Sequence, residues 1–279
     1  MLVNFVIIGA QKCGTTSLAA QLAAHPSICF CEKKEPEYFF RVEDWEAGIE
    51  GYHRLYEPGE GQICGEASTM YTGLPESQGT SSRLFEYNPN LKLIYIMRQP
   101  VERVISNYSH DLVRGFVKSQ PETAIFKDPG YISRSRYAVQ IRPYLELFPR
   151  ENILLMVFEE YIANQFRTLE QIAAFLGISA DAFATTASAD RHKSVGQRYP
   201  KNPAIRAVVK SGAFQAVRPI VTASIREPIR RLLTNELAEK PHFSSALREA
   251  VWRFVEDDVR GVEELLGRRL DVWRLGEAG

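Results

Sequence analysis

Residues 3–18 constrain the fold of this chain more than any other stretch. An apolar run rich in Val and Ile ends at Gly9, a short polar loop follows, and Leu18 and Leu22 then recur at the spacing of one helix face. This order predicts a buried strand, a tight loop and the start of a helix. Main-chain N–H groups at a helix N-terminus lack intrahelical acceptors and carry the positive end of the helix dipole. The loop therefore predicts a site for phosphate or sulfate.

The loop is close to the nucleotide-binding signature G-x-x-x-x-G-K-S/T. Gly9 and Gly14 have the required separation, but Thr15 occupies the lysine position and the lysine of the loop is Lys12. A lysine at that place approaches a bound anion from another side. The pattern thus favours an anion-binding loop over an ordinary NTPase site, and a strand-to-helix turn without a ligand is the structural alternative.

The remainder of the chain repeats the alternation of strands and helices. We expect strands near 27–30, 63–71, 91–97 and 152–158, and helices near 15–24, 100–108, 131–149, 166–177 and 245–266. Such alternation predicts an α/β fold with a P-loop-like doubly wound sheet, mainly parallel, and flanking helices. We expect one domain over residues 1–279.

Charge and composition exclude several classes of protein. The formal net charge is zero, so no overall field attracts nucleic acid or an anionic membrane. No apolar run is long enough to span a bilayer and none has the form of a signal peptide, so we expect a cytoplasmic location. The four cysteines are predicted to be reduced and to bind no metal. Cys13 is the one thiol for which we expect a lowered pKa, because it lies at a helix N-terminus.

Three other stretches carry candidate binding residues. Residues 32–40 place mixed charges beside three aromatic residues, a composition that fits the edge of a cleft or a solvated turn before a buried segment. Arg98 follows a buried strand and Ser106 lies two helical turns later, an arrangement suited to a phosphate, although an ion pair would also explain Arg98. Residues 191–231 contain ten basic residues and one acid, which fits a polyanionic ligand, nucleic acid or a solvated face.

Together these motifs resemble the sulfotransferases that use 3'-phosphoadenosine 5'-phosphosulfate (PAPS), in the branch related to heparan sulfate sulfotransferases and their bacterial relatives. The similar segments are Lys12–Ser17 for the 5'-phosphosulfate, Glu35–Phe39 for the catalytic glutamate and Arg98–Ser106 for the 3'-phosphate. The resemblance also extends to the C-terminal segment 265–273. It differs at Ala67, where heparan sulfate enzymes often carry lysine, and at residues 195–197, near a late nucleotide-contacting motif.

The resemblance implies a role for each group of residues. Glu35 would be the base that deprotonates the acceptor hydroxyl, and Lys12 would stabilise the leaving group. The residues implied in nucleotide binding are Lys12, Cys13, Gly14, Thr15, Thr16, Ser17, Arg98, Ser106, Lys193, Gly196 and Arg198. The residues implied in acceptor binding are Lys34, Glu37, Tyr38, Phe39, Ser68 and Tyr71.

The implied reaction moves a sulfuryl group from PAPS to a hydroxyl of a small-molecule, lipid or carbohydrate acceptor, without a metal. Two alternatives remain from the residues alone. One is a P-loop kinase or NTPase, which the position of Lys12 disfavours. The other is a non-catalytic nucleotide or nucleic-acid binding module that uses the basic segment 191–231.

Overall fold

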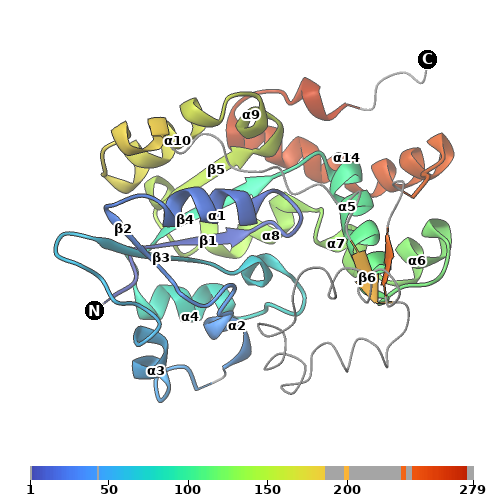
Figure 1. The fold of residues 1–279 in the computed structure, drawn as a ribbon. Coiled ribbons are helices and arrows are strands. Elements are labelled where there is room, and N and C mark those ends of the chain that lie inside the picture. Colours follow the sequence, from blue (N-terminus) through green and yellow to red (C-terminus); the bar gives the residue numbers. More distant parts are fainter. Residues whose placement is uncertain (1, 43, 186–197, 201–233, 237–240, 275–279) are drawn as a thin grey trace, which may run out of the picture.

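A five-stranded parallel sheet forms the centre of the protein, with strand order β2-β3-β1-β4-β5 (Figure 1). The computed structural model describes residues 2–42, 44–185, 198–200, 234–236 and 241–274. The strands of the sheet are β1 (Phe5–Gly9), β2 (Ile28–Phe30), β3 (Ile63–Ala67), β4 (Lys92–Met97) and β5 (Ile153–Val157). A separate antiparallel pair consists of β6 (Arg198–Pro200) and β7 (Thr234–Glu236).

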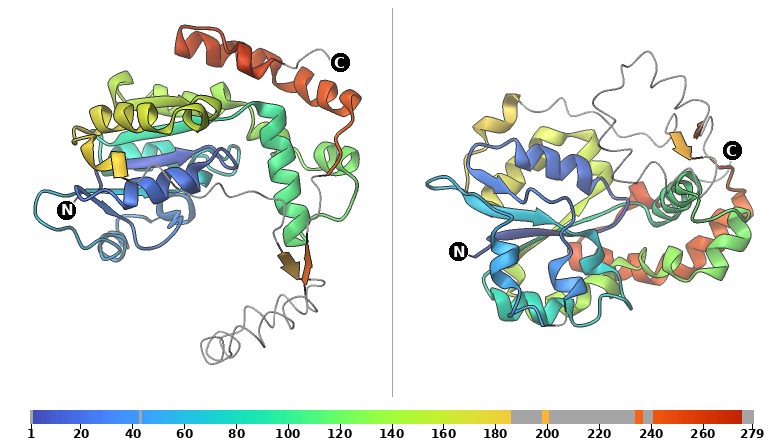
Figure 2. Two further views of the ribbon diagram at one scale, coloured as in Figure 1. Left: turned by 45° about the horizontal axis from the view of Figure 1, so that its top comes forward. Right: turned by 60° about the horizontal axis from the view of Figure 1, so that its bottom comes forward.

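Helices cover both faces of the sheet (Figures 1 and 2). On one face lie α1 (Thr15–Ala23), α9 (Phe158–Ala163) and α10 (Gln165–Leu176); on the other lie α4 (Thr80–Tyr87) and α8 (Tyr137–Leu145). Two longer helices, α5 (Pro100–Arg114) and α14 (Ser245–Leu266), contact each other beside the sheet. Short helical segments complete the described chain: α2 (Tyr38–Arg41), α3 (Ile49–His53), α6 (Pro121–Lys127), α7 (Gly130–Ser133), and the 3-10 turns Thr69–Thr72, Arg150–Asn152, Asp181–Thr185 and Asp271–Trp273.

The central position of β1 explains its composition. Every residue of β1 is buried, and its neighbours β3 and β4 lie on opposite edges, with Phe5 opposite both Gly65 and Lys92. A strand covered on both faces has to be apolar throughout, which is why the Val- and Ile-rich run was recognisable. The sheet order reverses at β1, so the loop that leaves its carboxyl end lies in the crevice where ligands bind in this fold class.

The predicted α/β fold is confirmed, and the expected helix 245–266 has those bounds. Ser244 caps it by accepting the N–H of Leu247 at 3.2 Å. The expected helix 131–149 is wrong as a single element, because α7 and α8 are separate. The carbonyl of Tyr131 accepts a bond from Arg103 at 2.9 Å, and the N–H of Ser135 donates instead to Ile132. A buried arginine thus takes the carbonyl that a continuous helix would use.

The basic segment and the possible membrane spans bear on the predicted binding partners. Most of the basic segment 191–231 lies outside the described residues, which include only 198–200 of it. No helix in the described ranges is long and apolar enough to cross a membrane.

Candidate active site

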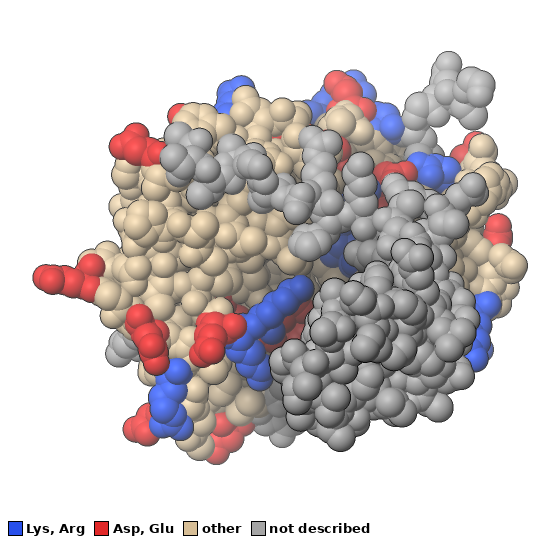
Figure 3. Space-filling model, in the orientation of Figure 1, with Lys and Arg blue, Asp and Glu red and all other residues tan. Residues whose placement is uncertain are grey.

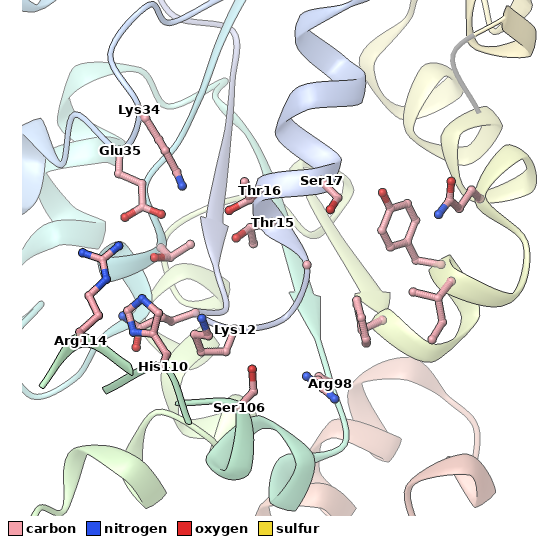
Figure 4. A pocket seen from close by; sticks show the side chains of 17 residues that line it. Lys12, Thr15, Thr16, Ser17, Lys34, Glu35, Arg98, Ser106, His110 and Arg114 are labelled. Carbon is pink, nitrogen blue, oxygen red and sulfur yellow. The ribbon is translucent and has the colours of Figure 1, made fainter. Parts of the chain in front are cut away.

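A cavity of about 430 Å³ lies at the carboxyl ends of β1 and β4, where the sequence placed an anion site (Figure 4). The loop after β1, the start of α1, the segment before α2, and α5 all contribute to it. Nine of the predicted residues line the cavity: Lys12, Gly14, Thr15, Thr16, Ser17, Lys34, Glu35, Arg98 and Ser106. Segments from three separate parts of the sequence therefore meet in one site.

Gly14 allows the loop to turn into α1. Its φ of 84° is left-handed, and a Cβ atom there would lie 2.6 Å from the ring of Phe158. Glycine is thus required both by the backbone conformation and by the approach of the ring. Gly14 is the N-cap of α1, and no side chain of the described residues caps that helix. The first N–H groups of α1, with the hydroxyls of Thr15 and Thr16, are available to a bound anion.

Arg103 holds the loop after β1 from the core side and does not line the cavity. Its side chain is fully buried, and its Nε donates to the main-chain carbonyl of Gln11 at 3.1 Å. Its Nη2 donates to the side chains of Gln11 and Asn107 at 3.2 and 3.0 Å. The resemblance groups this arginine with the segment implied in 3'-phosphate binding, but its contacts here are with the loop after β1.

Arg98 and Ser106 line the opposite wall of the cavity (Figure 4). The guanidinium of Arg98 lies 5.2 Å from the centre of the Phe158 ring, and one of its nitrogens is 3.5 Å from Glu102. The ion pair that was the alternative explanation for Arg98 is therefore present, and it leaves the side chain in the cavity. Stacking on an aromatic ring orients a guanidinium for a planar, bidentate anion contact.

The ammonium group of Lys12 is in an environment that disfavours its charge. Burial lowers its pKa to about 8, and the charges of Arg103, Arg114 and Lys34 act in the same direction, while Asp111 opposes them. Lys12 also has a left-handed backbone with φ 71°. An anion bound beside these cations would raise the pKa of Lys12 and stabilise its charged form.

Glu35 lies across the cavity from the loop (Figure 4). Burial raises the pKa of its carboxyl group, Lys34 and Lys12 oppose that shift, and Glu37 adds to it. A carboxylate with a raised pKa is a better proton acceptor for a hydroxyl than an ordinary one.

The cavity also contains residues that the sequence reasoning missed. His110 and Arg114 extend from α5 toward Glu35 and Lys12 in Figure 4. Both follow Ser106 at steps of four residues, so the helical period of α5 could have revealed them. The other lining residues that were missed are Gln11, Thr69, Phe158, Tyr161, Ile162 and Gln165. On the face drawn in Figure 3, Lys and Arg side chains near the centre lie next to acidic atoms.

Cys13 differs from its predicted role. Its side chain is fully buried, its thiol lies 3.6 Å from the hydroxyl of Tyr137, and its N–H donates to Ala10. Burial raises the pKa of the thiol to about 11, so the expected lowered pKa is wrong. Desolvation outweighs the helix N-terminus because the side chain points into the core and not along the helix axis.

Five of the predicted acceptor residues do not line the cavity. Phe39, Ser68 and Tyr71 are 0%, 0% and 1% exposed, and Glu37 is 8% exposed. Tyr38 is partly buried and stacks on Tyr52 at 4.8 Å. The aromatic side chains pack into the core beneath the loop that carries Glu35, so of the two expectations for residues 32–40 they fit the turn before a buried segment.

A buried carboxyl group lies among these aromatics. Glu66 is 0% exposed and accepts hydrogen bonds from Tyr52 at 2.8 Å, Tyr71 at 3.0 Å and Ser68 at 2.6 Å. Burial raises its pKa to about 7 against the effect of these three donors. The sequence showed Glu66 only as part of a motif, and no spacing indicated that it is buried.

The remaining predicted residues are only partly described. Lys193 and Gly196 lie outside the described residues, and Arg198 belongs to β6, whose side chains are not described. Within the described part of the chain, no three His, Cys, Asp or Glu side chains form a group that would hold a metal ion. The prediction of a reaction without a metal stays a prediction.

A smaller cavity of about 250 Å³ adjoins the first and shares Thr15, Thr16, Lys34 and Glu35 with it. Its other walls are mainly apolar and come from Ala19, Ala20, Ala23, Phe30, Cys31, Glu32 and Ala67. Ala67, one of the positions at which the sequence departs from the motifs that it resembles, faces this cavity.

Comparisons with known proteins find similarity in sequence and in overall structure. The sequence model of the sulfotransferase domain family matches residues 3–260. A sulfotransferase from Alicyclobacillus acidocaldarius has a similar structure, with a TM-score of 0.69 and 25% identity over 99% of this chain and 100% of that one.

Two curated relatives match over shorter regions. Membrane-associated sulfotransferase kil1 of Dictyostelium discoideum is 40% identical over 109 residues, which are 38% of this chain and 22% of that protein. Heparan sulfate glucosamine 3-O-sulfotransferase 3A1 of Mus musculus is 30% identical over 183 residues, which are 62% of this chain and 45% of that protein. These matches cover less than half the length of either relative.

Proposed function

The chain belongs to the sulfotransferase domain family, and from that premise we propose that it transfers a sulfuryl group from PAPS to an acceptor hydroxyl. The observation that carries the proposal is the meeting of Lys12, Arg98 and Glu35 in one cavity. These side chains supply cations for the two ends of a nucleotide and a base for the acceptor. The position of Lys12 fits this reaction better than the P-loop kinase or NTPase alternative.

The cavity fits the two anionic ends of PAPS. The loop N–H groups, Lys12, Thr15 and Thr16 would hold the 5'-phosphosulfate, with Gly14 allowing close approach. Arg98 and Ser106 would hold the 3'-phosphate on the opposite wall. Phe158 and Tyr161 offer aromatic faces for the adenine ring in the same cavity.

The reaction needs a proton acceptor and a stabilised leaving group. The Glu35 carboxylate takes the proton of the acceptor hydroxyl as the hydroxyl oxygen forms its bond to sulfur. The bond between sulfur and the bridging oxygen breaks, and its electron pair stays on the 5'-phosphate of adenosine 3',5'-bisphosphate (PAP). The Lys12 ammonium would stabilise that charge. Positioning and electrostatics carry most of the catalysis, as in phosphoryl transfer.

The acceptor would enter beside Glu35. The mouse relative is named for heparan sulfate glucosamine, a carbohydrate, but this chain has Ala67 where the resemblance implies lysine. The apolar walls of the adjoining cavity favour an acceptor with an apolar part next to its hydroxyl. Sugars, lipid or polyketide alcohols and phenols all belong in a test panel.

Transfer from PAPS to such a panel, followed by mass spectrometry for an added sulfuryl group, tests the function. Glu35→Gln should abolish turnover while PAP affinity, measured by calorimetry, stays within about twofold, because the amide keeps the shape and loses the base. Near wild-type turnover in this variant would indicate that His110, and not Glu35, is the base. Glu37 and His53 are less suitable as the base, since neither lines the cavity and His53 bonds Tyr87 at 2.9 Å.

The alternatives predict other results. Magnesium-dependent ATP turnover without sulfuryl transfer would indicate the kinase or NTPase. Strongly salt-sensitive oligonucleotide binding would indicate the nucleic-acid module. We further propose that residues 1–279 act as one sulfotransferase domain and that the protein is cytoplasmic, which limited proteolysis and cell fractionation would check.

A further inference from the structure

The segment that carries Glu35 has an unusual backbone. Glu35 and Glu37 both have φ of 50°, in the left-handed region that residues other than glycine rarely adopt. Such a conformation persists where surrounding contacts hold it in place. The contacts that hold this segment are therefore part of how the proposed base is positioned.

Two main-chain N–H groups attach the segment to the core. The N–H of Glu37 donates to the hydroxyl of Ser68 at 3.0 Å, and the N–H of Phe39 donates to the hydroxyl of Tyr71 at 3.3 Å. These amides lie two and four residues after Glu35. Both acceptors come from the segment that follows β3, so the position of Glu35 depends on how these two hydroxyls are oriented.

One buried carboxylate orients both hydroxyls. Ser68 donates to one oxygen of Glu66 and Tyr71 to the other, and Tyr52 of α3 donates to the same oxygen as Tyr71. A hydroxyl has a single hydrogen, and an ionised carboxylate can only accept. Because the hydrogens of Ser68 and Tyr71 point to Glu66, the lone pairs of these hydroxyls are directed at the two main-chain amides.

We propose that Glu66 is a positioning residue for the sulfuryl transfer, which fixes the Glu35 backbone through the hydroxyls of Ser68 and Tyr71. This inference rests on the proposed function of Glu35 as the base. Glu66 itself lies outside the cavity and touches no reacting group. Its effect is on the geometry of the base and not on nucleotide binding, because the loop after β1 is held by a different residue, Arg103.

Glu66→Gln in the full chain, compared with the wild type above pH 8 where the Glu66 carboxyl is ionised, tests the proposal with two separate measurements. The amide group donates where a carboxylate accepts, so one hydroxyl must rotate its hydrogen away and lose its contact with the segment. We expect kcat to fall about 10- to 100-fold, the loss typical of a misplaced catalytic group, with PAP affinity within about twofold. We also expect hydrogen exchange at the amides of Glu37 and Phe39 to be at least about tenfold faster.

Asp258→Asn is the matched control. Asp258 is also a buried carboxylate that accepts two main-chain N–H groups, from Ala138 and Val139 at 3.0 Å each, but it acts on α8. Its amide variant should leave kcat and the exchange rates at Glu37 and Phe39 unchanged. Equal effects of both variants would show a general loss of stability and overturn the proposal.

Two variants that each remove one of the hydroxyls, Ser68→Ala and Tyr71→Phe, test the proposal if Glu66→Gln folds poorly. Ser68→Ala should speed exchange at Glu37 and not at Phe39, whereas Tyr71→Phe should do the reverse. Unchanged exchange in both variants would overturn the structural link. Faster exchange with unchanged kcat would overturn the positioning role. If no acceptor is sulfated by the wild type, the exchange result still stands and the failure belongs to the proposed function.

Discussion

Arg103 donates from Nε to the carbonyl of Gln11 at 3.1 Å, and this bond joins α5 to the loop that follows β1. A buried guanidinium with five available donors can hold a main-chain carbonyl and a side-chain amide of the same residue together. The anion-binding loop is therefore held from inside the core, in a manner that leaves its outer face free for a ligand.

Arg103→Lys should weaken PAP binding about tenfold and lower the free energy of unfolding by about 2–4 kcal/mol, because an ammonium cannot reproduce the fork of bonds. Calorimetry with PAP and urea denaturation measure the two effects. Arg150→Lys is the control, since Arg150 also donates to a main-chain carbonyl, that of Ile153, at the opposite end of the sheet. A lysine variant of Arg103 with unchanged PAP affinity would contradict the supporting role.

Gly14 is expected to tolerate no side chain. Gly14→Ala forces alanine into a left-handed conformation, at about 1–2 kcal/mol, and brings its Cβ within 2.6 Å of the Phe158 ring. Overpacking adds about 1–3 kcal/mol and moves the ring that stacks on Arg98. Gly177→Ala separates the two effects, because Gly177 has φ of 78° but no atom within 4 Å of the new Cβ. Equal losses in thermal denaturation would show that the contact with Phe158 costs nothing.

Arg98 is predicted to recognise the 3'-phosphate. Arg98→Ala should weaken PAP binding about 10- to 100-fold, the effect of a lost charged hydrogen bond, and weaken binding of adenosine 5'-phosphate less than about threefold. Arg114→Ala is a suitable control, because Arg114 lies at the Glu35 end of the same cavity (Figure 4). If both ligands lose the same affinity in Arg98→Ala, Arg98 does not read the 3'-phosphate.

The parts of the site that were predictable are those determined by local pattern. The strand, loop and helix around Gly14 follow from hydrophobic periodicity, and Arg98 follows from its place at the end of a buried strand. The roles of Arg103, Glu66 and Cys13 were not predictable, because each depends on burial by residues distant in sequence. Polar side chains in a sequence look exposed, and only packing shows that Ser68 and Tyr71 support the site from the core.

Lys12 should make nucleotide binding depend on pH. Its pKa of about 8 in the free protein means that the ammonium loses its proton as pH rises through 8. A bound phosphate raises that pKa, so PAP binding takes up a proton above pH 8 and PAP affinity should fall by up to tenfold per pH unit there. Calorimetry between pH 7 and 9.5 measures this slope. Lys12→Arg should remove this pH dependence, because arginine stays charged. An equal slope in that variant would show that another group causes the pH dependence.

Glu66 should make the protein less stable as pH rises, even though its carboxylate orients the loop. Its pKa is about 7 in the folded protein and about 4.5, the ordinary value for glutamate, in the unfolded chain. Burial and the charge of Glu37 disfavour ionisation in the folded protein. The folded state therefore holds the proton more tightly, so its contribution to stability is complete below pH 4.5 and is lost as pH rises to 7. At about 1.4 kcal/mol per pKa unit, the loss is about 3 kcal/mol. Urea denaturation from pH 4.5 to 8 should show the unfolding free energy of the wild type falling relative to Glu66→Gln, which has no group to titrate there, and parallel curves would contradict the assignment.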